Sequence, residues 1–234
     1  IIPTFFYIFS YLQFPDQILS HMVLGSSLGV IVFSSLSSTF SHNFRGAVDW
    51  GLIKLVAPSI VVGSTLGGIT AGVLESDTLQ GLVALFLVVA SIQLIFEFPP
   101  PPQNPRTNLV GPVLAGGGIG WLSGVFGIGG GIFSVPYFYH RGLLMMKAIG
   151  TSAACGIPIA LAGSLSYMII GYENISLPKN SIGYVYLPAT IIVGLVSSLT
   201  AKYGVKIAHR MKQKKLRIGF AFLVMLMALN LLMR

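Results

Sequence analysis

The sequence predicts an all-α membrane protein with several transmembrane helices and two related halves, and three observations lead to this prediction. Only 9% of the 234 residues are charged and 54% are hydrophobic, whereas a soluble domain carries about 25% charged residues. The hydrophobic residues form long runs without a periodic stripe, which argues against a soluble protein with a very apolar core. Several short patterns also occur twice along the chain in the same order.

Hydrophobic runs long enough to cross a bilayer follow one another along the chain, since a hydrocarbon core about 30 Å thick needs about 20 helical residues. Residues 1–12 fit part of a further span, and residues 110–139 are apolar but too rich in glycine for one regular helix. A proline run at 99–102 predicts an extended linker, because proline cannot continue a helix. The predicted spans are 22–40, 52–74, 79–96, 148–170, 184–201 and 218–233.

Two triplets of small residues mark equivalent points in the halves, Gly25-Ser26-Ser27 and Gly150-Thr151-Ser152. An aromatic stretch opened by a proline precedes each triplet, and a long apolar run containing a second proline follows it. An ordered set of matches predicts two diverged repeats, although each match alone is weak. The prolines are Pro3 and Pro136 before the triplets, and Pro58 and Pro188 after them.

These repeats divide the chain into a first transmembrane repeat at 1–98 and a second at 109–234, joined by a proline-rich linker at 99–108. The second repeat carries a glycine-rich segment, 116–131, ahead of its opening proline, Pro136. The first repeat has no equivalent segment in this sequence, which starts two residues before the opening proline Pro3. We therefore expect the N-terminal part of the first repeat to be missing from this sequence.

Positive charge predicts how the repeats are oriented, because Lys and Arg are enriched in cytoplasmic loops. If the basic segment 202–217 is cytoplasmic, single crossings place Arg141 and Lys147 on the same side. The first repeat carries Arg45 and Lys54 around a different loop, so the basic side is exchanged between the copies. This exchange predicts inverted repeats, and it requires the glycine-rich stretch to enter and leave on one side as a re-entrant hairpin.

The glycine cluster at 127–131 is the first candidate for a binding site. Glycine costs about 1 kcal/mol per position in a helix, so four glycines within five residues predict a break. Backbone N–H groups freed inside a membrane need partners, and the positive end of the half-helix that follows can hold an anion. The more widely spaced Gly116, Gly120 and Gly124 instead fit close packing against another helix.

The two triplets are the second candidate. Both lie near predicted helix starts, where hydroxyl and N–H donors suit an oxyanion without the desolvation cost of a buried Lys or Arg. N-capping or hydrogen bonding between helices is the alternative role for these hydroxyls. Together with the flanking prolines, the two features predict an anion site formed by Gly127, Gly129, Gly130, Gly131, Pro136, Gly150, Thr151, Ser152, Pro3, Gly25, Ser26 and Ser27.

Groups suited to other chemistry are scarce. No acidic residue lies inside a predicted span, no catalytic or metal-binding motif is present, and Gly127-x-Gly129 lacks the acidic partner of a dinucleotide site. Cys155 is the one cysteine, which excludes an intrachain disulfide. The net charge of +8 comes mostly from residues 202–217 beside an apolar span, which favours membrane lipids over nucleic acid. We expect no cofactor and no enzyme activity.

The motifs resemble those of the TauE/SafE family of membrane proteins. The resemblance covers essentially the whole chain. It is carried by Gly124-Val-Phe-Gly-Ile-Gly-Gly-Gly131, Val135-Pro136 and Ala148-Ile-Gly-Thr-Ser152, with Ile2-Pro3, Gly25-Ser26-Ser27 and His42, Gly46, Val48, Asp49, Trp50, Pro58 and Gly63 in the first copy.

The resemblance implies a transporter of a small sulfur-containing anion, such as sulfite or an organosulfonate, in a bacterial plasma membrane. We expect a secondary transporter that works by alternating access, either coupled to an ion gradient of H+ or Na+ or by facilitated flow, because no nucleotide-binding motif is visible. The alternatives are an anion channel, or a membrane-embedded enzyme or scaffold acting on a sulfur compound. An enzyme would need acidic or His clusters at one interface, and a channel would need a continuous polar lining. The sequence leaves the oligomeric state open.

Overall fold

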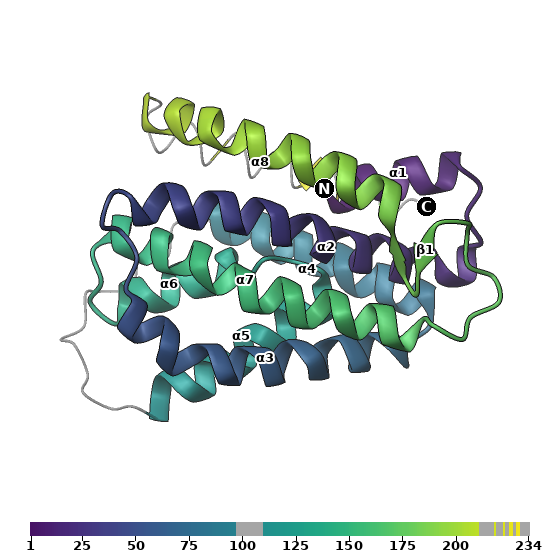
Figure 1. Cartoon of the computed structure of the whole chain (residues 1–234), viewed down its shortest axis with the longest axis horizontal. Coiled ribbons are helices and arrows are strands. Elements are labelled where there is room, and N and C mark those ends of the chain that lie inside the picture. Colours follow the sequence, from purple (N-terminus) through teal and green to yellow (C-terminus); the bar gives the residue numbers. More distant parts are fainter. Residues whose placement is uncertain (97–109, 211–217, 219–221, 223–224, 227, 230–234) are drawn as a thin grey trace.

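The computed structural model describes residues 1–96 and 110–210, together with helical residues at positions 218, 222, 225, 226, 228 and 229. Within these residues the chain forms eight helices and one small β-hairpin, in agreement with the predicted all-α fold (Figure 1). The elements are α1 (Ile2–Tyr11), α2 (Asp16–Asn43), α3 (Trp50–Gly72), α4 (Ser76–Phe96), α5 (Val110–Phe126), α6 (Gly131–His140), α7 (Met145–Ile170), β1 (Ser181–Ile182), β2 (Val185–Tyr186) and α8 (Leu187–Arg210).

The predicted spans correspond to helices whose ends differ from the prediction. The start predicted at residue 184 is wrong, because Tyr184 lies in the turn between β1 and β2, and α8 begins only at Leu187. The basic segment 202–217 was expected to be a loop, but α8 continues into it as far as Arg210. The linker at 99–108 and most of the predicted span 218–233 lie outside the described residues.

The long helices run side by side along the longest dimension of the molecule, and successive ones along the chain run in opposite directions (Figure 1). α2 runs toward the end that carries loop 44–49, whereas α7 starts at that end and runs the opposite way. The two helices pack against each other, so the helices that carry the triplets form an antiparallel pair. Around this pair α3 packs on α7 and α8 packs on α2, while α6 packs on α7 and α1 packs on α2.

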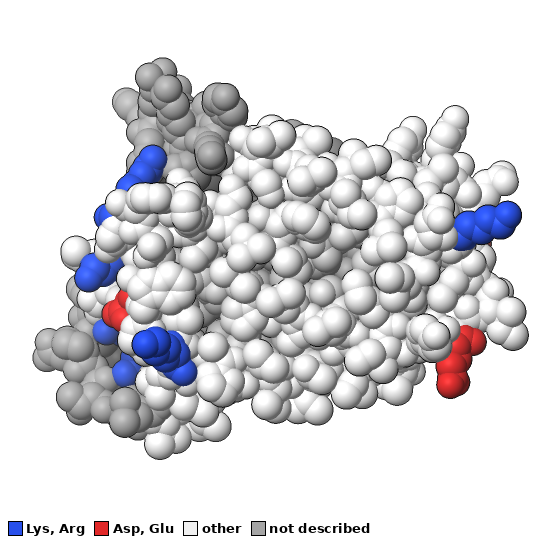
Figure 2. All heavy atoms as spheres, viewed as in Figure 1, with Lys and Arg blue, Asp and Glu red and all other residues white. Residues whose placement is uncertain are grey.

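Charged side chains lie at the two ends of the molecule, and the face drawn in Figure 2 has no Lys, Arg, Asp or Glu across its middle. The end with loops 44–49 and 141–144 is the basic end, and the opposite end is the acidic end. The basic end holds Arg45, Lys54, Arg141 and Lys147 with Asp49, and the acidic end holds Asp16, Glu75, Asp77 and Glu173 with Lys179.

An uncharged middle between charged ends is typical of a protein that spans a membrane. Three of the helices, α2, α3 and α7, are long and apolar enough to cross a bilayer. Large apolar side chains on the outer faces are exposed, including Leu66 and Ile69 on α3 and Leu161 and Leu165 on α7. The described part of the chain is therefore an α-helical membrane protein.

Glycines hold α5 directly against α3. A Cβ atom on Gly120 would collide with the carbonyl oxygen of Ile60, and one on Gly124 would lie 2.5 Å from the carbonyl oxygen of Ser64. The neighbour is backbone in both places, so the helices could accommodate a side chain only by moving apart. The prediction that these glycines serve close helix packing is confirmed, and this contact fixes the position of the glycine break that follows α5.

Candidate functional site

The predicted break lies between α5, which ends at Phe126, and α6, which begins at Gly131. Gly127 and Gly130 have φ angles of +64° and +74°, a left-handed conformation that costs a residue with a Cβ about 1–2 kcal/mol. Neighbouring side chains also leave no room there, because a Cβ on Gly130 would lie 2.5 Å from Cδ1 of Ile159. The prediction of a break at the glycine cluster is confirmed.

The break lies in the interior, away from both ends of the molecule. α5 starts and α6 finishes at the basic end, so the two helices form a hairpin that enters and leaves on one side (Figure 1). Ideal Cβ atoms built on Gly127 and Gly129 would contact Leu24 and Ile31, which lie in the central part of α2. Since α6 has ten residues, its starting point is about 15 Å deeper than the basic end.

Side-chain hydroxyls at the break donate to its carbonyl groups. Ser27 Oγ on α2 donates to the Gly127 carbonyl at 3.0 Å, and Ser134 Oγ on α6 donates to the Gly130 carbonyl at 2.9 Å. The hydroxyl of Tyr167, fully buried on α7, lies 3.3 Å from the Gly124 carbonyl at the end of α5. These bonds satisfy acceptors and leave the N–H groups of the break available.

Four successive backbone N–H groups are open at the start of α6. The N–H groups of Gly129, Gly130, Gly131 and Ile132 donate to no backbone carbonyl within the described part of the chain. Gly130 is the N-cap of α6 and has no side chain that could cap the helix. Because the first N–H groups of a helix lack internal partners and sit at its positive end, this is the geometry that binds anions.

Ser152 on α7 reaches the break through Ser134. Their Oγ atoms are 2.6 Å apart and both residues are buried. Ser134 uses its proton on the Gly130 carbonyl, so Ser152 must be the donor in this pair. The third residue of each triplet, Ser27 or Ser152, is therefore connected to the glycine break by hydrogen bonds.

Ser123 is the residue of this site that the sequence did not reveal. Its Oγ is fully buried and has no hydrogen-bond partner, and it points at Gly130, where an ideal Cβ would lie 3.2 Å away. A buried hydroxyl without a partner costs about 1–3 kcal/mol, and its position beside the open helix start makes Ser123 a candidate residue of the anion site. A lone serine in an apolar helix is usually bonded to its own helix, and nothing in the sequence distinguishes Ser123 from that case.

The first two residues of each triplet contact loops and not the break. A Cβ on Gly25 would lie 2.5 Å from the Tyr184 carbonyl, and one on Gly150 would collide with the Ala47 carbonyl. The second residue of each triplet accepts a hydrogen bond from the backbone N–H of a residue that directly precedes a helix. Ser26 accepts from Tyr186, before α8, at 2.9 Å, and Thr151 accepts from Asp49, before α3, at 3.0 Å. The same two-residue device thus holds the start of α8 on α2 and the start of α3 on α7.

The expectation that the triplets lie near helix starts is wrong. α2 begins at Asp16, nine positions before Gly25, and α7 begins at Met145, five positions before Gly150. Beyond the first turn, backbone N–H groups are used in the i to i−4 bonds of the helix and are not available to an anion. Of the prolines, Pro3 lies in the first turn of α1 and Pro136 lies inside α6.

Replacing Thr151 with valine should lower the stability of the protein by about 1–2 kcal/mol, because the Asp49 N–H loses its acceptor. Thr151→Ser keeps the hydroxyl and should retain the stability. The thermal midpoint in detergent measures both effects. If Thr151→Val left stability unchanged but weakened sulfite binding, Thr151 would be a ligand and not a loop anchor.

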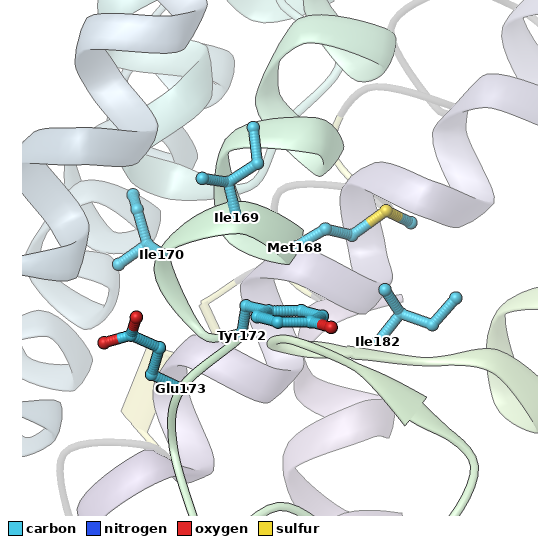
Figure 3. A pocket seen from close by; sticks show the side chains of 6 residues that line it. All are labelled: Met168, Ile169, Ile170, Tyr172, Glu173 and Ile182. Atoms are coloured by element: carbon cyan, nitrogen blue, oxygen red, sulfur yellow. The ribbon is translucent and has the colours of Figure 1, made fainter.

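A separate surface hollow of about 450 Å3 lies at the acidic end, where α7 finishes. Apolar side chains line it together with the Tyr172 ring and the Glu173 carboxylate (Figure 3). It is lined by Met168, Ile169, Ile170, Tyr172, Glu173 and Ile182, none of which belongs to the predicted site. Within the described residues, no group of His, Cys, Asp and Glu is placed to hold a metal ion.

Comparison with known families decides which family the sequence belongs to. The family described as "Sulfite exporter TauE/SafE" matches residues 1–231. The chain belongs to the TauE/SafE family. As a member of a transporter family it is a membrane transporter and not an enzyme, as predicted from the resemblance.

Curated relatives agree with membership of the TauE/SafE family. A "Probable membrane transporter protein" of Haemophilus influenzae is 28% identical and aligns over 100% of this chain and 89% of its own length. One from Methanocaldococcus jannaschii is also 28% identical, over 99% of this chain and 85% of the relative. A third, YdhB of Bacillus subtilis, is 30% identical over 66% of each chain. No solved structure matches the sequence.

Proposed function

We propose that this TauE/SafE protein is a secondary transporter that exports a small sulfur-containing oxyanion, such as sulfite or an organosulfonate, across the cell membrane. The family's description names sulfite. The site is the glycine break, where the anion takes the place of the missing partners of the four N–H groups and of Ser123. The open donors of the break and the family's description support a substrate that carries several acceptor oxygens.

One observation carries this proposal: an unpartnered, fully buried hydroxyl faces an open helix start. Ser123 Oγ and the N–H groups of residues 129–132 are all donors, and the neighbouring hydroxyls of Ser27 and Ser134 are already used on carbonyls. A small anion with three or more acceptor oxygens can satisfy several such donors at once. The positive N-terminal end of α6 would repel a cation at this position.

The transport cycle is proposed to move the two inverted repeats, residues 1–98 and 109–234, against each other. The antiparallel pairing of α2 with α7, and the matching contacts of α3 with α7 and of α8 with α2, support a symmetric relation between the two repeats. Rocking about the α2–α7 contact exposes the break first to one side of the membrane and then to the other. H+ or Na+ is the proposed coupling ion, since alternating access by itself only equilibrates the substrate.

Flux measured in proteoliposomes tests the function. The reconstituted full chain should carry labelled sulfite or a sulfonate down its gradient, and an imposed H+ or Na+ gradient should drive accumulation if that ion is coupled. Vesicles that contain the folded protein but transport no sulfur anion would contradict the proposal.

Replacing Ser123 with alanine should weaken anion affinity by about tenfold to a hundredfold, because a hydrogen bond to a charged ligand contributes about 1.5–3 kcal/mol. The unliganded protein should become more stable by about 1 kcal/mol, since an unpartnered buried hydroxyl is removed. Isothermal titration and the thermal midpoint without ligand measure the two effects.

Ser91→Ala is the matched control for Ser123→Ala. Ser91 is also fully buried, but its hydroxyl donates to the Val88 carbonyl at 2.7 Å within α4. This variant should lose a little stability and keep its anion affinity. Equal affinity in wild type and Ser123→Ala would remove Ser123 from the site.

Single cysteines introduced at exposed ends of the helices test the inverted topology. In a Cys155→Ala background, Arg45→Cys and Lys147→Cys at the basic end should react with an impermeant thiol reagent only from the cytoplasmic side. Asp77→Cys and Glu173→Cys at the acidic end should react only from outside. Labelling of positions 45 and 147 from opposite sides would exclude the inverted arrangement.

A further inference from the structure

The donors at the glycine break are all electrically neutral. They are the N–H groups of residues 129–132 and the hydroxyl of Ser123. Neither α5 nor α6 contains a Lys, Arg, Asp or Glu. In the other helices around the break, the charged residues lie near helix starts: Asp16 in α2, Lys54 in α3, Asp77 in α4 and Lys147 in α7. The site therefore offers no full positive charge to a bound anion.

Without a full counter-charge, the charge of the substrate decides whether burial is favourable. The cost of moving an ion from water into a medium of low dielectric constant rises with the square of its charge, so a dianion costs about four times as much as a monoanion. The attraction of the helix start rises only in proportion to the charge, and the helix end supplies only about half an elementary charge. Doubling the substrate charge thus increases the cost more than the gain.

We infer that the site selects singly charged sulfur oxyanions, namely hydrogensulfite and sulfonates, and excludes the dianions sulfite, sulfate and thiosulfate. This inference rests on the proposed function, because it names the charge state of the substrate at the same site. It separates selectivity by charge from selectivity by shape, since methanesulfonate and sulfate are both tetrahedral at sulfur and similar in size.

Competition between matched anions is the direct test. Proteoliposomes containing the full chain are assayed for uptake of labelled hydrogensulfite at one mildly acidic pH, with methanesulfonate or sulfate added outside. Methanesulfonate should inhibit uptake at a concentration at least about tenfold lower than sulfate. In Ser123→Ala vesicles both anions should become weaker inhibitors, while Ser91→Ala vesicles should behave as wild type.

A pH series provides a second measurement on one sulfur centre. Sulfite exchanges between its singly and doubly charged forms near neutral pH, so at constant total sulfite the initial rate should rise as the pH is lowered in step with the hydrogensulfite fraction. Methanesulfonate keeps one charge throughout and its rate should stay level, which controls for protein groups that titrate. The titratable side chains on the helices around the break are Asp16, His21, His42, Lys54, Asp77, Tyr137, Tyr139, His140, Lys147, Cys155 and Tyr167.

The possible results separate this inference from the proposed function. Inhibition by sulfate equal to that by methanesulfonate, or a sulfite rate that follows the dianion, would overturn the charge selectivity and leave sulfur-anion transport intact. If no sulfur anion were taken up and none competed, both the charge selectivity and the proposed function would be overturned.

Discussion

Replacing Gly130 with alanine should abolish sulfite transport and destabilise the protein by about 2–4 kcal/mol. The alanine would have to adopt φ near +74°, and its methyl group would lie 2.5 Å from Cδ1 of Ile159 and 3.2 Å from Ser123 Oγ. Relief of either contact shifts the start of α6, and with it the position of the four open N–H groups relative to Ser123. Flux in proteoliposomes and the thermal midpoint in detergent are the measurements.

Gly46→Ala is the matched control, because it separates backbone strain from damage to the site. Gly46 has φ of +63°, but a Cβ there would meet no atom within 4 Å. This variant should lose only about 1–2 kcal/mol and should transport normally. If Gly130→Ala transported sulfite as well as Gly46→Ala does, the start of α6 would not form the anion site.

Replacing Gly120 with valine should cost about 3 kcal/mol or more, because the Cβ would collide with the carbonyl oxygen of Ile60 on the facing helix. Neither backbone can give way, so α5 must separate from α3 and take the glycine break with it. The expected results are a lower thermal midpoint, measured by unfolding in detergent, and loss of anion binding in whatever protein remains folded.

Gly118→Ala tests whether the loss of stability in Gly120→Val comes from the α3–α5 contact or from replacing a glycine within α5. Gly118 lies on the open side of α5, where a Cβ meets no atom within 4 Å. Alanine should stabilise the helix there by up to about 1 kcal/mol. Similar loss of stability in both variants would contradict the assignment of Gly120 to the α3–α5 contact.

Much of the fold could be predicted from the sequence, because a bilayer imposes simple rules on composition. Long uncharged runs in a chain with few charges must form helices, since no water is present to satisfy the backbone. Crowded glycines at 127–131 must break a helix, since each one lowers its stability. These rules act on neighbouring residues, and both predictions are confirmed by the structure.

Helix boundaries and the roles of the triplets were harder to predict. The sequence around Tyr184 is as apolar as that of α8. Tyr184 nevertheless lies in the turn of a hairpin whose backbone packs on Gly25. Ser26 and Thr151 have the composition of a binding motif, yet their hydroxyls accept hydrogen bonds from the N–H groups of Tyr186 in β2 and of Asp49 before α3, both far away along the chain. Local sequence does not record such partners, because they depend on how distant segments meet.

The sequence by itself determined that this protein is a helical membrane protein with a glycine break at residues 127–131, because both features follow from local composition. Only the tertiary structure decided how the hydroxyls around that break are used. Ser27 and Ser134 are occupied by carbonyls, whereas Ser123 is left without a partner beside Gly130. The difference arises because hydrogen bonds between helices depend on which faces pack together, and three serines in similar apolar helices are indistinguishable until those faces meet.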